Sequence, residues 1–159
     1  MLVSKGCARV RMLDPSQWAT VNMTPEQVDL VRRSFDAIWP VRRKLAALFY
    51  SRFFELAPDA MPLFPNDMER QHLKLMDTIA AIVGALDKSE MFQSIISHAG
   101  RQHAQFGAKP PHFAAFGDAL LWGLEHQFGD TFTPELKEAW SALYGVVQSE
   151  MMRAGRLQA

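Results

Sequence analysis

Apolar residues recur along most of this chain every three or four positions, the spacing that gathers them on one face of an α-helix. The clearest stripe runs from Asp67 to Leu86, where the sequence predicts one long helix with Asp67 as its cap. Its apolar members are Met68, Leu75, Met76, Ile79, Ile82, Val83 and Leu86. We find no alternation of apolar and polar residues, which would be typical of a strand, and no internal repeat. The pattern therefore predicts an all-α fold.

Threonine followed by proline indicates where the first and last helices begin. Thr24 can cap a helix whose first turn holds Pro25, and Gln27 can reach back to the cap as in a capping box. Thr133-Pro134-Glu135 repeats the signal before a last helix that runs to about Arg153. We expect an irregular N-terminal extension over residues 1–22 and a single domain over residues 23–155.

Prolines also separate the helices in the middle of the chain. Pro40 interrupts the first helical stripe, and a second helix continues through Leu56 until Pro58 and Pro62 force a short turn-like segment that ends at Phe64-Pro65. A further helix is predicted from about Ser89 to Gln105, and another from Pro110-Pro111 to about Phe128. The whole chain therefore reads as about six to eight helices joined by short turns.

Composition fits one compact domain without a strong electrostatic field. The chain has 159 residues, of which 48% are hydrophobic, enough to bury a core. Seventeen basic and seventeen acidic residues give a net charge of zero, which disfavours nucleic acid and anionic lipid as partners. The uncharged stretches are shorter than the ~18 apolar residues of a membrane span, and residues 1–22 have no signal-like apolar run. We expect a cytoplasmic protein.

The common catalytic and metal-binding motifs are missing from the sequence. It contains no G-x-S-x-G, no G-x-G-x-x-G, no Walker lysine and no H-E-x-x-H. His98 and His103 point about 140° apart on one helix, which disfavours a zinc site. The single cysteine, Cys7, forms no internal disulfide and belongs to no C-x-x-C-H motif, so any prosthetic group is held non-covalently.

Among the five histidines, His103 has the most informative surroundings. It follows Ile95, Ile96 and Ala99 on one helix face, while the neighbouring Arg101, Gln102 and Gln105 can face water. Upstream lie Tyr50, Phe64, Gln71 and Leu75, at spacings that allow several helices to converge on one pocket. An imidazole that faces a tyrosine and an amide across an apolar cavity suits a haem iron. A histidine on a helix is more often an ordinary surface or core residue, so the surroundings carry the hypothesis.

Four segments resemble bacterial globins, in particular the globin module of flavohaemoglobins and related single-domain haemoglobins. They are LAALFYSRFF (residues 45–54), PDAMPLF (58–64), GRQH (100–103) and AWSALYG (139–145). The similarity covers about residues 23–153, with the elements in the order that the family has. It implies a globin fold enclosing haem b, iron protoporphyrin IX.

The resemblance assigns roles to individual residues. His103 falls at the proximal iron ligand, Phe64 at the aromatic residue wedged against the porphyrin, and Tyr50 at the distal tyrosine that donates a hydrogen bond to dioxygen. Gln71 falls at the distal position above the iron and Leu75 at the residue that narrows the pocket. Ordinary core packing is the alternative for Phe64 and for Tyr50.

Further assignments leave alternatives open. Lys74 can pair with a haem propionate or remain a solvated lysine, and Phe106 and Phe113 can line the pocket or belong to an aromatic core. If the register of the long helix shifts by one residue, His72 enters the pocket and ligates the iron, which gives a six-coordinate haem as in neuroglobin-like proteins.

Two departures from the flavohaemoglobin pattern limit what the resemblance implies. Phe113 replaces the tyrosine that, with a glutamate, hydrogen-bonds the iron-ligating histidine, and no glutamate stands near Leu157. The electron push from the proximal side is therefore in doubt. No flavin or nicotinamide domain follows, so any oxidised haem must be reduced by a separate reductase.

The resemblance implies reversible binding of dioxygen, with carbon monoxide and nitric oxide as further gas ligands. Two other functions remain open: a nitric oxide dioxygenase that relies on a separate reductase, and a haem-based sensor or six-coordinate globin.

Overall fold

The computed structural model describes residues 23–157, and in that range the chain is helical without strands. The α-helices are α3 (Pro25–Ile38), α4 (Arg42–Leu56), α5 (Glu69–Gly84), α6 (Ser89–Gln105), α7 (Pro110–Phe128) and α8 (Pro134–Ala154). Short 3-10 helices, η3 (Trp39–Val41), η4 (Pro58–Leu63) and η5 (Gly129–Thr131), connect some of them. The predicted all-α fold is confirmed. The extension predicted for residues 1–22 lies outside the described residues.

The predicted threonine caps are present at both ends of the domain. The hydroxyl of Thr24 accepts a hydrogen bond from the Gln27 backbone N–H at 3.1 Å, and the Gln27 side chain accepts one from the Thr24 N–H at 3.0 Å. This is the predicted capping box. Thr133 likewise accepts a hydrogen bond from the backbone N–H of Leu136 at 3.2 Å. Both helices therefore begin where local chemistry satisfies their free N–H groups.

The long middle helix begins and ends two residues inside its predicted limits. Met68, not Asp67, occupies the capping position of α5, so that prediction was wrong. Asp67 nevertheless contributes, because its carboxylate accepts a hydrogen bond from the Glu69 backbone N–H at 3.1 Å. The segment between Pro58 and Phe64, predicted as turn-like, is the 3-10 helix η4, since two prolines prevent a regular α-helix there.

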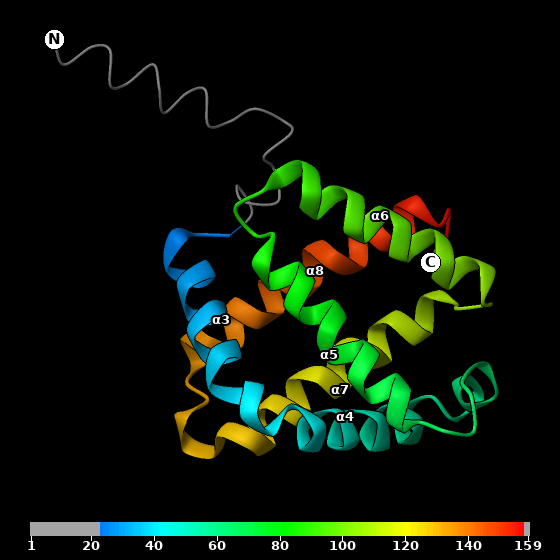
Figure 1. Ribbon diagram of the computed structural model, residues 1–159, viewed down its shortest axis with the longest axis horizontal. Coiled ribbons are helices and arrows are strands. Elements are labelled where there is room, and N and C mark those ends of the chain that lie inside the picture. Colours follow the sequence, from blue (N-terminus) through cyan, green and yellow to red (C-terminus); the bar gives the residue numbers. More distant parts are fainter. Residues whose placement is uncertain (1–22, 158–159) are drawn as a thin grey trace, which may run out of the picture.

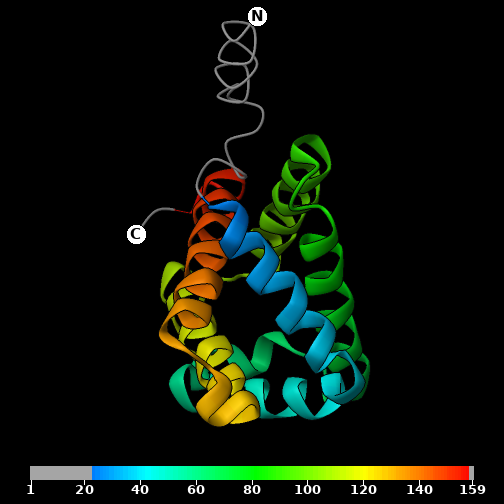
Figure 2. The same ribbon diagram turned by 90° about the vertical axis from the view of Figure 1, so that its left-hand side faces the viewer.

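The helices pack in crossed pairs. α7 packs against α4, and α8 packs against both α6 and α3. In Figure 1, α4 lies along the lower edge of the molecule and α6 along the upper edge, with α5 crossing the space between them. Figure 2 shows α5 and α8 on opposite sides, with α3 passing obliquely in front. Helices far apart in the sequence therefore face one another across the middle of the domain. No helix of the described range is both long and apolar enough to cross a membrane.

Close contacts fix α8 against its neighbours. The indole N–H of Trp140 in α8 donates to the hydroxyl of Ser34 in α3 at 2.9 Å, and Trp140 is 1% exposed. On the other side, a Cβ at Gly100 of α6 would lie 2.4 Å from the carbonyl oxygen of Met151 in α8. Only glycine permits that approach. The helix that carries His103 is thereby held against α8.

Candidate functional site

Tyr50 is the buried polar centre of the site. It lies in α4, is 4% exposed, and accepts a hydrogen bond from the Gln71 side-chain amide of α5, with 3.1 Å between Nε2 and the phenol oxygen. Burial raises the pKa of Tyr50 to about 12, although the Gln71 hydrogen bond acts in the opposite direction. The phenol is therefore protonated at neutral pH. Because its oxygen accepts from Gln71, its own proton is available for another acceptor.

Aromatic rings surround the phenol of Tyr50. The ring of Phe64 meets it edge-on, with 5.6 Å between centroids and 71° between planes. The imidazole of His72 lies nearly parallel to it, at 5.3 Å and 18°. Gln71 and His72, adjacent in α5, therefore contact the same tyrosine at different atoms. Phe64 is half-buried, as are both α5 residues.

His103 lies in the last turn of α6 and is exposed. Its Nδ1 is 2.6 Å from the carbonyl oxygen of Ala99, one turn earlier in the same helix. A carbonyl only accepts, so Nδ1 carries the proton and donates, which leaves the lone pair of Nε2 free. A neutral imidazole with a backbone-held Nδ1–H and a free Nε2 is the arrangement that a metal-ligating histidine has. The donor chemistry of His103 therefore fits haem iron.

Phe113 is the aromatic neighbour of His103. The two ring centroids are 6.1 Å apart, and Phe113 is 5% exposed. Its backbone carbonyl accepts a hydrogen bond from the hydroxyl of Tyr144 in α8, whose pKa is raised by burial. The ring of Tyr144 occupies space that only a glycine at 117 leaves open. Sequence analysis did not identify Tyr144 as a site residue, because no local signal places a tyrosine of α8 against a glycine of α7.

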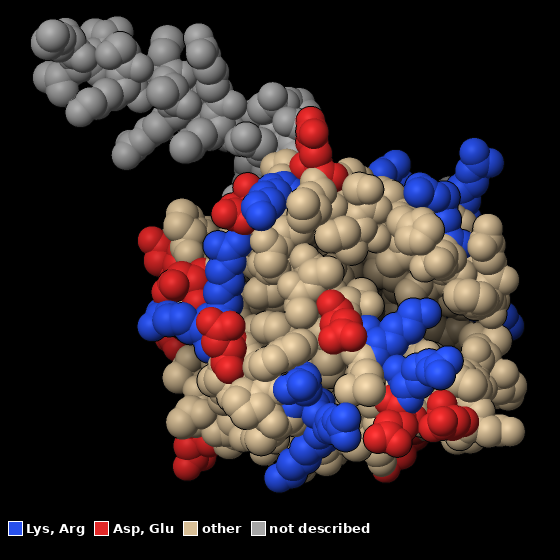
Figure 3. All heavy atoms as spheres, viewed as in Figure 1, with Lys and Arg blue, Asp and Glu red and all other residues tan. Residues whose placement is uncertain are grey.

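The remaining predicted residues differ in burial. Leu75 is 9% exposed and belongs to the core, Lys74 is exposed, and Phe106 is 65% exposed just beyond the end of α6. Figure 3 shows that the surface is hollowed below α6, with lysine and arginine side chains gathered along the lower rim of the hollow. A basic rim suits a ligand that carries carboxylates at its edge.

A histidine–aspartate pair joins the segments that flank the site. Nε2 of His112 lies 2.9 Å from Oδ2 of Asp59 in η4, while Nδ1 of His112 accepts from the Lys109 backbone N–H at 3.0 Å. The hydrogen bond from His112 is the main reason why the pKa of Asp59 lies below its usual value. Sequence analysis missed this pair, since its members are 53 positions apart.

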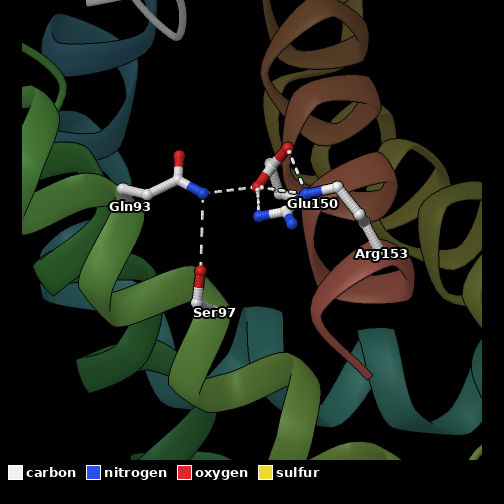
Figure 4. A network of polar contacts seen from close by, with 4 residues as sticks. All are labelled: Gln93, Ser97, Glu150 and Arg153. Carbon is white, nitrogen blue, oxygen red and sulfur yellow. Dashed lines mark hydrogen bonds and ion pairs between the residues drawn. The ribbon is translucent and has the colours of Figure 1, made fainter. Parts of the chain in front are cut away.

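A second network anchors α6 to α8 (Figure 4). Glu150 of α8, only 8% exposed, accepts hydrogen bonds from the Gln93 amide of α6 and from the Arg153 guanidinium, the latter at 2.8 Å. The Gln93 amide also donates to Ser97 at 3.4 Å. The Arg153 hydrogen bond holds the pKa of Glu150 below its usual value, against the opposing effect of burial. The helix of His103 is thus fixed to α8 through a buried carboxylate.

Two surface depressions elsewhere contain none of the predicted site residues. One is lined by Met23, Pro25, Val28, Asp29 and Arg32, and the other by Pro40, Val41, Arg42, Arg43 and Lys44. Within residues 23–157, no three His, Cys, Asp or Glu side chains gather in a way that could hold a metal ion. The candidate site therefore consists of two groups, Tyr50 with Gln71 and His72, and His103 with Phe113.

The family model and the sequence relatives that match this chain indicate the same family. A sequence model described as globin matches residues 47–151. The neuroglobin of Tetraodon nigroviridis is 30% identical over 146 residues, which cover 82% of this chain and 91% of the relative. The neuroglobin of Danio rerio is 28% identical over 139 residues, 78% of this chain and 87% of the relative. These relatives are neuroglobins, so the comparisons support the predicted globin family but not the finer resemblance to bacterial flavohaemoglobins.

One solved structure has the same fold at low sequence identity. It is the crystal structure of a hexacoordinated haem protein from an anhydrobiotic tardigrade at pH 4, with a TM-score of 0.77 and 17% identity. The match covers 84% of this chain and 96% of the other.

Proposed function

This chain belongs to the globin family, and from that premise we propose that it is a haem protein that binds dioxygen reversibly. His103 is the protein ligand of the iron in this proposal, and Tyr50 and Gln71 donate hydrogen bonds to the gas. The haem is b-type and non-covalently held. Lys74 would pair with its propionates, and Phe64, Leu75, Phe106 and Phe113 would contact the porphyrin.

The hydrogen bond from Gln71 to Tyr50 carries the proposal. When bound, haem supplies an iron centre at which a diatomic gas binds reversibly. The Gln71 amide donates to the phenol oxygen, so the phenol proton remains available to the gas. A hydrogen bond to a charged acceptor contributes about 1.5–3 kcal/mol, or roughly ten-fold to a hundred-fold in affinity. Tyr50 would in this way stabilise dioxygen, which accepts negative charge from the iron, much more than carbon monoxide.

The proximal side supports reversible binding over oxygen activation. The Nδ1–H of His103 donates to a neutral backbone carbonyl, that of Ala99. A carboxylate in that place would make the imidazole a stronger electron donor. Phe113, the nearest aromatic ring, has no hydroxyl to add. The imidazole is therefore a moderate donor, which favours release of the gas unchanged.

A six-coordinate globin is the second candidate, and the place of His72 favours it. His72 lies against Tyr50 and directly follows Gln71, so its imidazole belongs to the distal side of α5. The tardigrade haem protein of the same fold is hexacoordinated, which supports this candidate. In that case dioxygen competes with an internal ligand, and the protein suits gas sensing.

Absorption spectra of the haem-loaded protein test these functions. We expect a five-coordinate ferrous spectrum that becomes a long-lived oxygenated spectrum in air and loses that lifetime in Tyr50→Phe. A six-coordinate ferrous spectrum that His72→Ala abolishes supports the second candidate. Failure to take up haem contradicts both. Steady conversion of nitric oxide and dioxygen to nitrate, when a separate reductase is added, would extend the function to nitric oxide dioxygenation.

A further inference from the structure

Two consecutive residues of α5 hold Tyr50 at opposite ends of its side chain. The amide of Gln71 reaches the phenol oxygen at 3.1 Å, while the imidazole of His72 lies along the ring at 5.3 Å and 18°. Neighbouring side chains on a helix point about 100° apart. A third side chain can contact both of them only if it extends across the surface of the helix. The phenol of Tyr50 does so, with its ring beside one residue and its hydroxyl beside the other.

We propose that His72 is a positioning residue that fixes the ring plane of Tyr50 and thereby sets the discrimination between dioxygen and carbon monoxide. This inference rests on the proposed function, in which the Tyr50 hydroxyl donates to dioxygen. It assigns His72 a role in gas selectivity without a bond to iron.

The hydrogen bond from Gln71 fixes the hydroxyl of Tyr50 but not the plane of its ring, which is set by the rings packed around it. The torsion between Cβ and the ring of tyrosine is broad, so packing on the ring faces decides its plane. Phe49 and Phe64 meet the ring edge-on, at 75° and 71°, and Phe54 stacks on it at 30°. His72 presents the most nearly parallel face, at 18°. Offset parallel contact between flat rings is favourable beyond the area it buries. His72 is therefore well placed to limit rotation.

The flatness of the His72 side chain matters more for this role than its polarity. No hydrogen bond of the His72 ring is needed for the contact, and the residue is only half-buried. A phenylalanine at this position preserves a parallel ring, while leucine preserves bulk without flatness and alanine preserves neither. Phenylalanine should therefore rescue the function, and leucine should not.

The test compares gas dissociation rates in the haem-loaded, full-length protein. We expect His72→Ala and His72→Leu to speed dioxygen dissociation by about two-fold to ten-fold and to leave carbon monoxide dissociation nearly unchanged. His72→Phe should restore the original rate. The C–O stretching frequency of the carbon monoxide complex provides a second readout, since it reports the orientation of the Tyr50 dipole. His98→Ala, at an exposed histidine of α6, is the matched control.

The Tyr50→Phe background separates positioning from general packing. If His72 acts through the hydroxyl of Tyr50, His72→Ala has no further effect once that hydroxyl is removed. The proposal is overturned if His72→Ala speeds both gases equally, if it adds its full effect in the Tyr50→Phe background, or if His72→Phe fails to restore the rate.

Three other outcomes have distinct meanings. If the ferrous spectrum changes from six- to five-coordinate in both His72→Ala and His72→Phe, then His72 binds iron and the positioning role is wrong. If Tyr50→Phe itself leaves dioxygen dissociation unchanged, the proposed function of the distal pair fails. If Tyr50→Phe speeds dissociation but His72→Ala does not, only the present inference fails.

Discussion

The two sides of the candidate haem site are held by different kinds of contact. On the distal side, Tyr50 of α4 is buried and bonded to Gln71 of α5, so its position depends on how two helices pack. On the proximal side, His103 is exposed, and its ring is oriented by the carbonyl of Ala99 one turn away in the same helix. The distal geometry therefore depends on tertiary contacts between helices, and the proximal geometry depends on a contact within one helix. Changes in the core should disturb gas selectivity before they disturb iron ligation.

The helix that carries His103 is nevertheless firmly anchored at a distance from the imidazole. Gly100 allows the backbone of α8 to approach α6 at Met151, and Glu150 binds Gln93 across the same pair of helices. On the proximal side, these contacts hold the backbone of α6 in place, while the orientation of the His103 imidazole depends on one hydrogen bond. The following predictions test this contrast.

The largest effect is expected from His103→Gly. Because the imidazole is exposed and locally held, its removal should abolish normal iron ligation while leaving the helical content of the protein unchanged. Added imidazole should restore the five-coordinate spectrum, since an exposed position is open to a small ligand. Absorption spectra measure the iron ligation, and circular dichroism spectra measure the helical content. A variant that keeps the original haem spectrum without imidazole would show that another residue ligates the iron.

The next effect is expected from Gln71→Leu on the distal side. Loss of the amide removes one donor to Tyr50 and to the gas, so dioxygen should dissociate on the order of ten-fold faster. Carbon monoxide dissociation should change little. Stopped-flow measurement of both rates checks this, with Gln102→Leu, an exposed glutamine of α6, as the matched control. Equal acceleration of both gases would point to a wider pocket instead of a lost hydrogen bond.

A smaller effect, on stability, is expected from Glu150→Gln. The pKa of Glu150 in the folded protein is lowered, chiefly by the Arg153 hydrogen bond. Since a free glutamate has a pKa of about 4.3, the carboxylate stabilises the fold above that pH, and this stabilisation is lost as the pH falls through the lowered folded value. The variant should lose about 1–3 kcal/mol at pH 7.

Urea denaturation at several pH values measures the effect of Glu150→Gln. The variant and the original protein should become equally stable in acid, because both then lack the negative charge. Glu138→Gln, at an exposed glutamate of the same helix, is the control. A stability difference that persists unchanged below pH 3 would contradict the assigned cause.

The smallest effect is expected from Phe113→Tyr, which adds a hydroxyl beside the proximal imidazole. The Phe113 ring lies 6.1 Å from that of His103, and its backbone is held by Tyr144. A new phenol there should make the imidazole a better electron donor and shift the iron reduction potential modestly downward. Spectroelectrochemistry measures the shift. An upward shift would mean that the phenol does not reach His103.

Sequence analysis located most helix ends correctly because their signals are local. The hydroxyl of Thr24 and the amide of Gln27 interact within one turn, and prolines such as Pro40 break a helix through their own ring. The start of α5 was placed two residues early, since Asp67 can satisfy a free N–H from a turn before the helix as well as from the cap.

The site was predicted less completely than the fold. Resemblance to globins supplied Tyr50, Gln71 and His103, and the structure brings the first two into contact. The parallel ring of His72, the Asp59 pair with His112 and the link from Gln93 to Glu150 were not anticipated. Members of the latter two pairs are more than fifty positions apart.

The sequence by itself determined that this chain is helical and where most of its helices begin and end, and its resemblance to globins supplied the hypothesis that His103 binds iron. The helices and their ends depend on contacts within a turn or two of helix, which residue types specify directly. Only the tertiary structure decided which side of α5 meets Tyr50 and which carboxylate anchors α6. Such contacts depend on how helices cross, and a small rotation of a packed helix exchanges one neighbour for another.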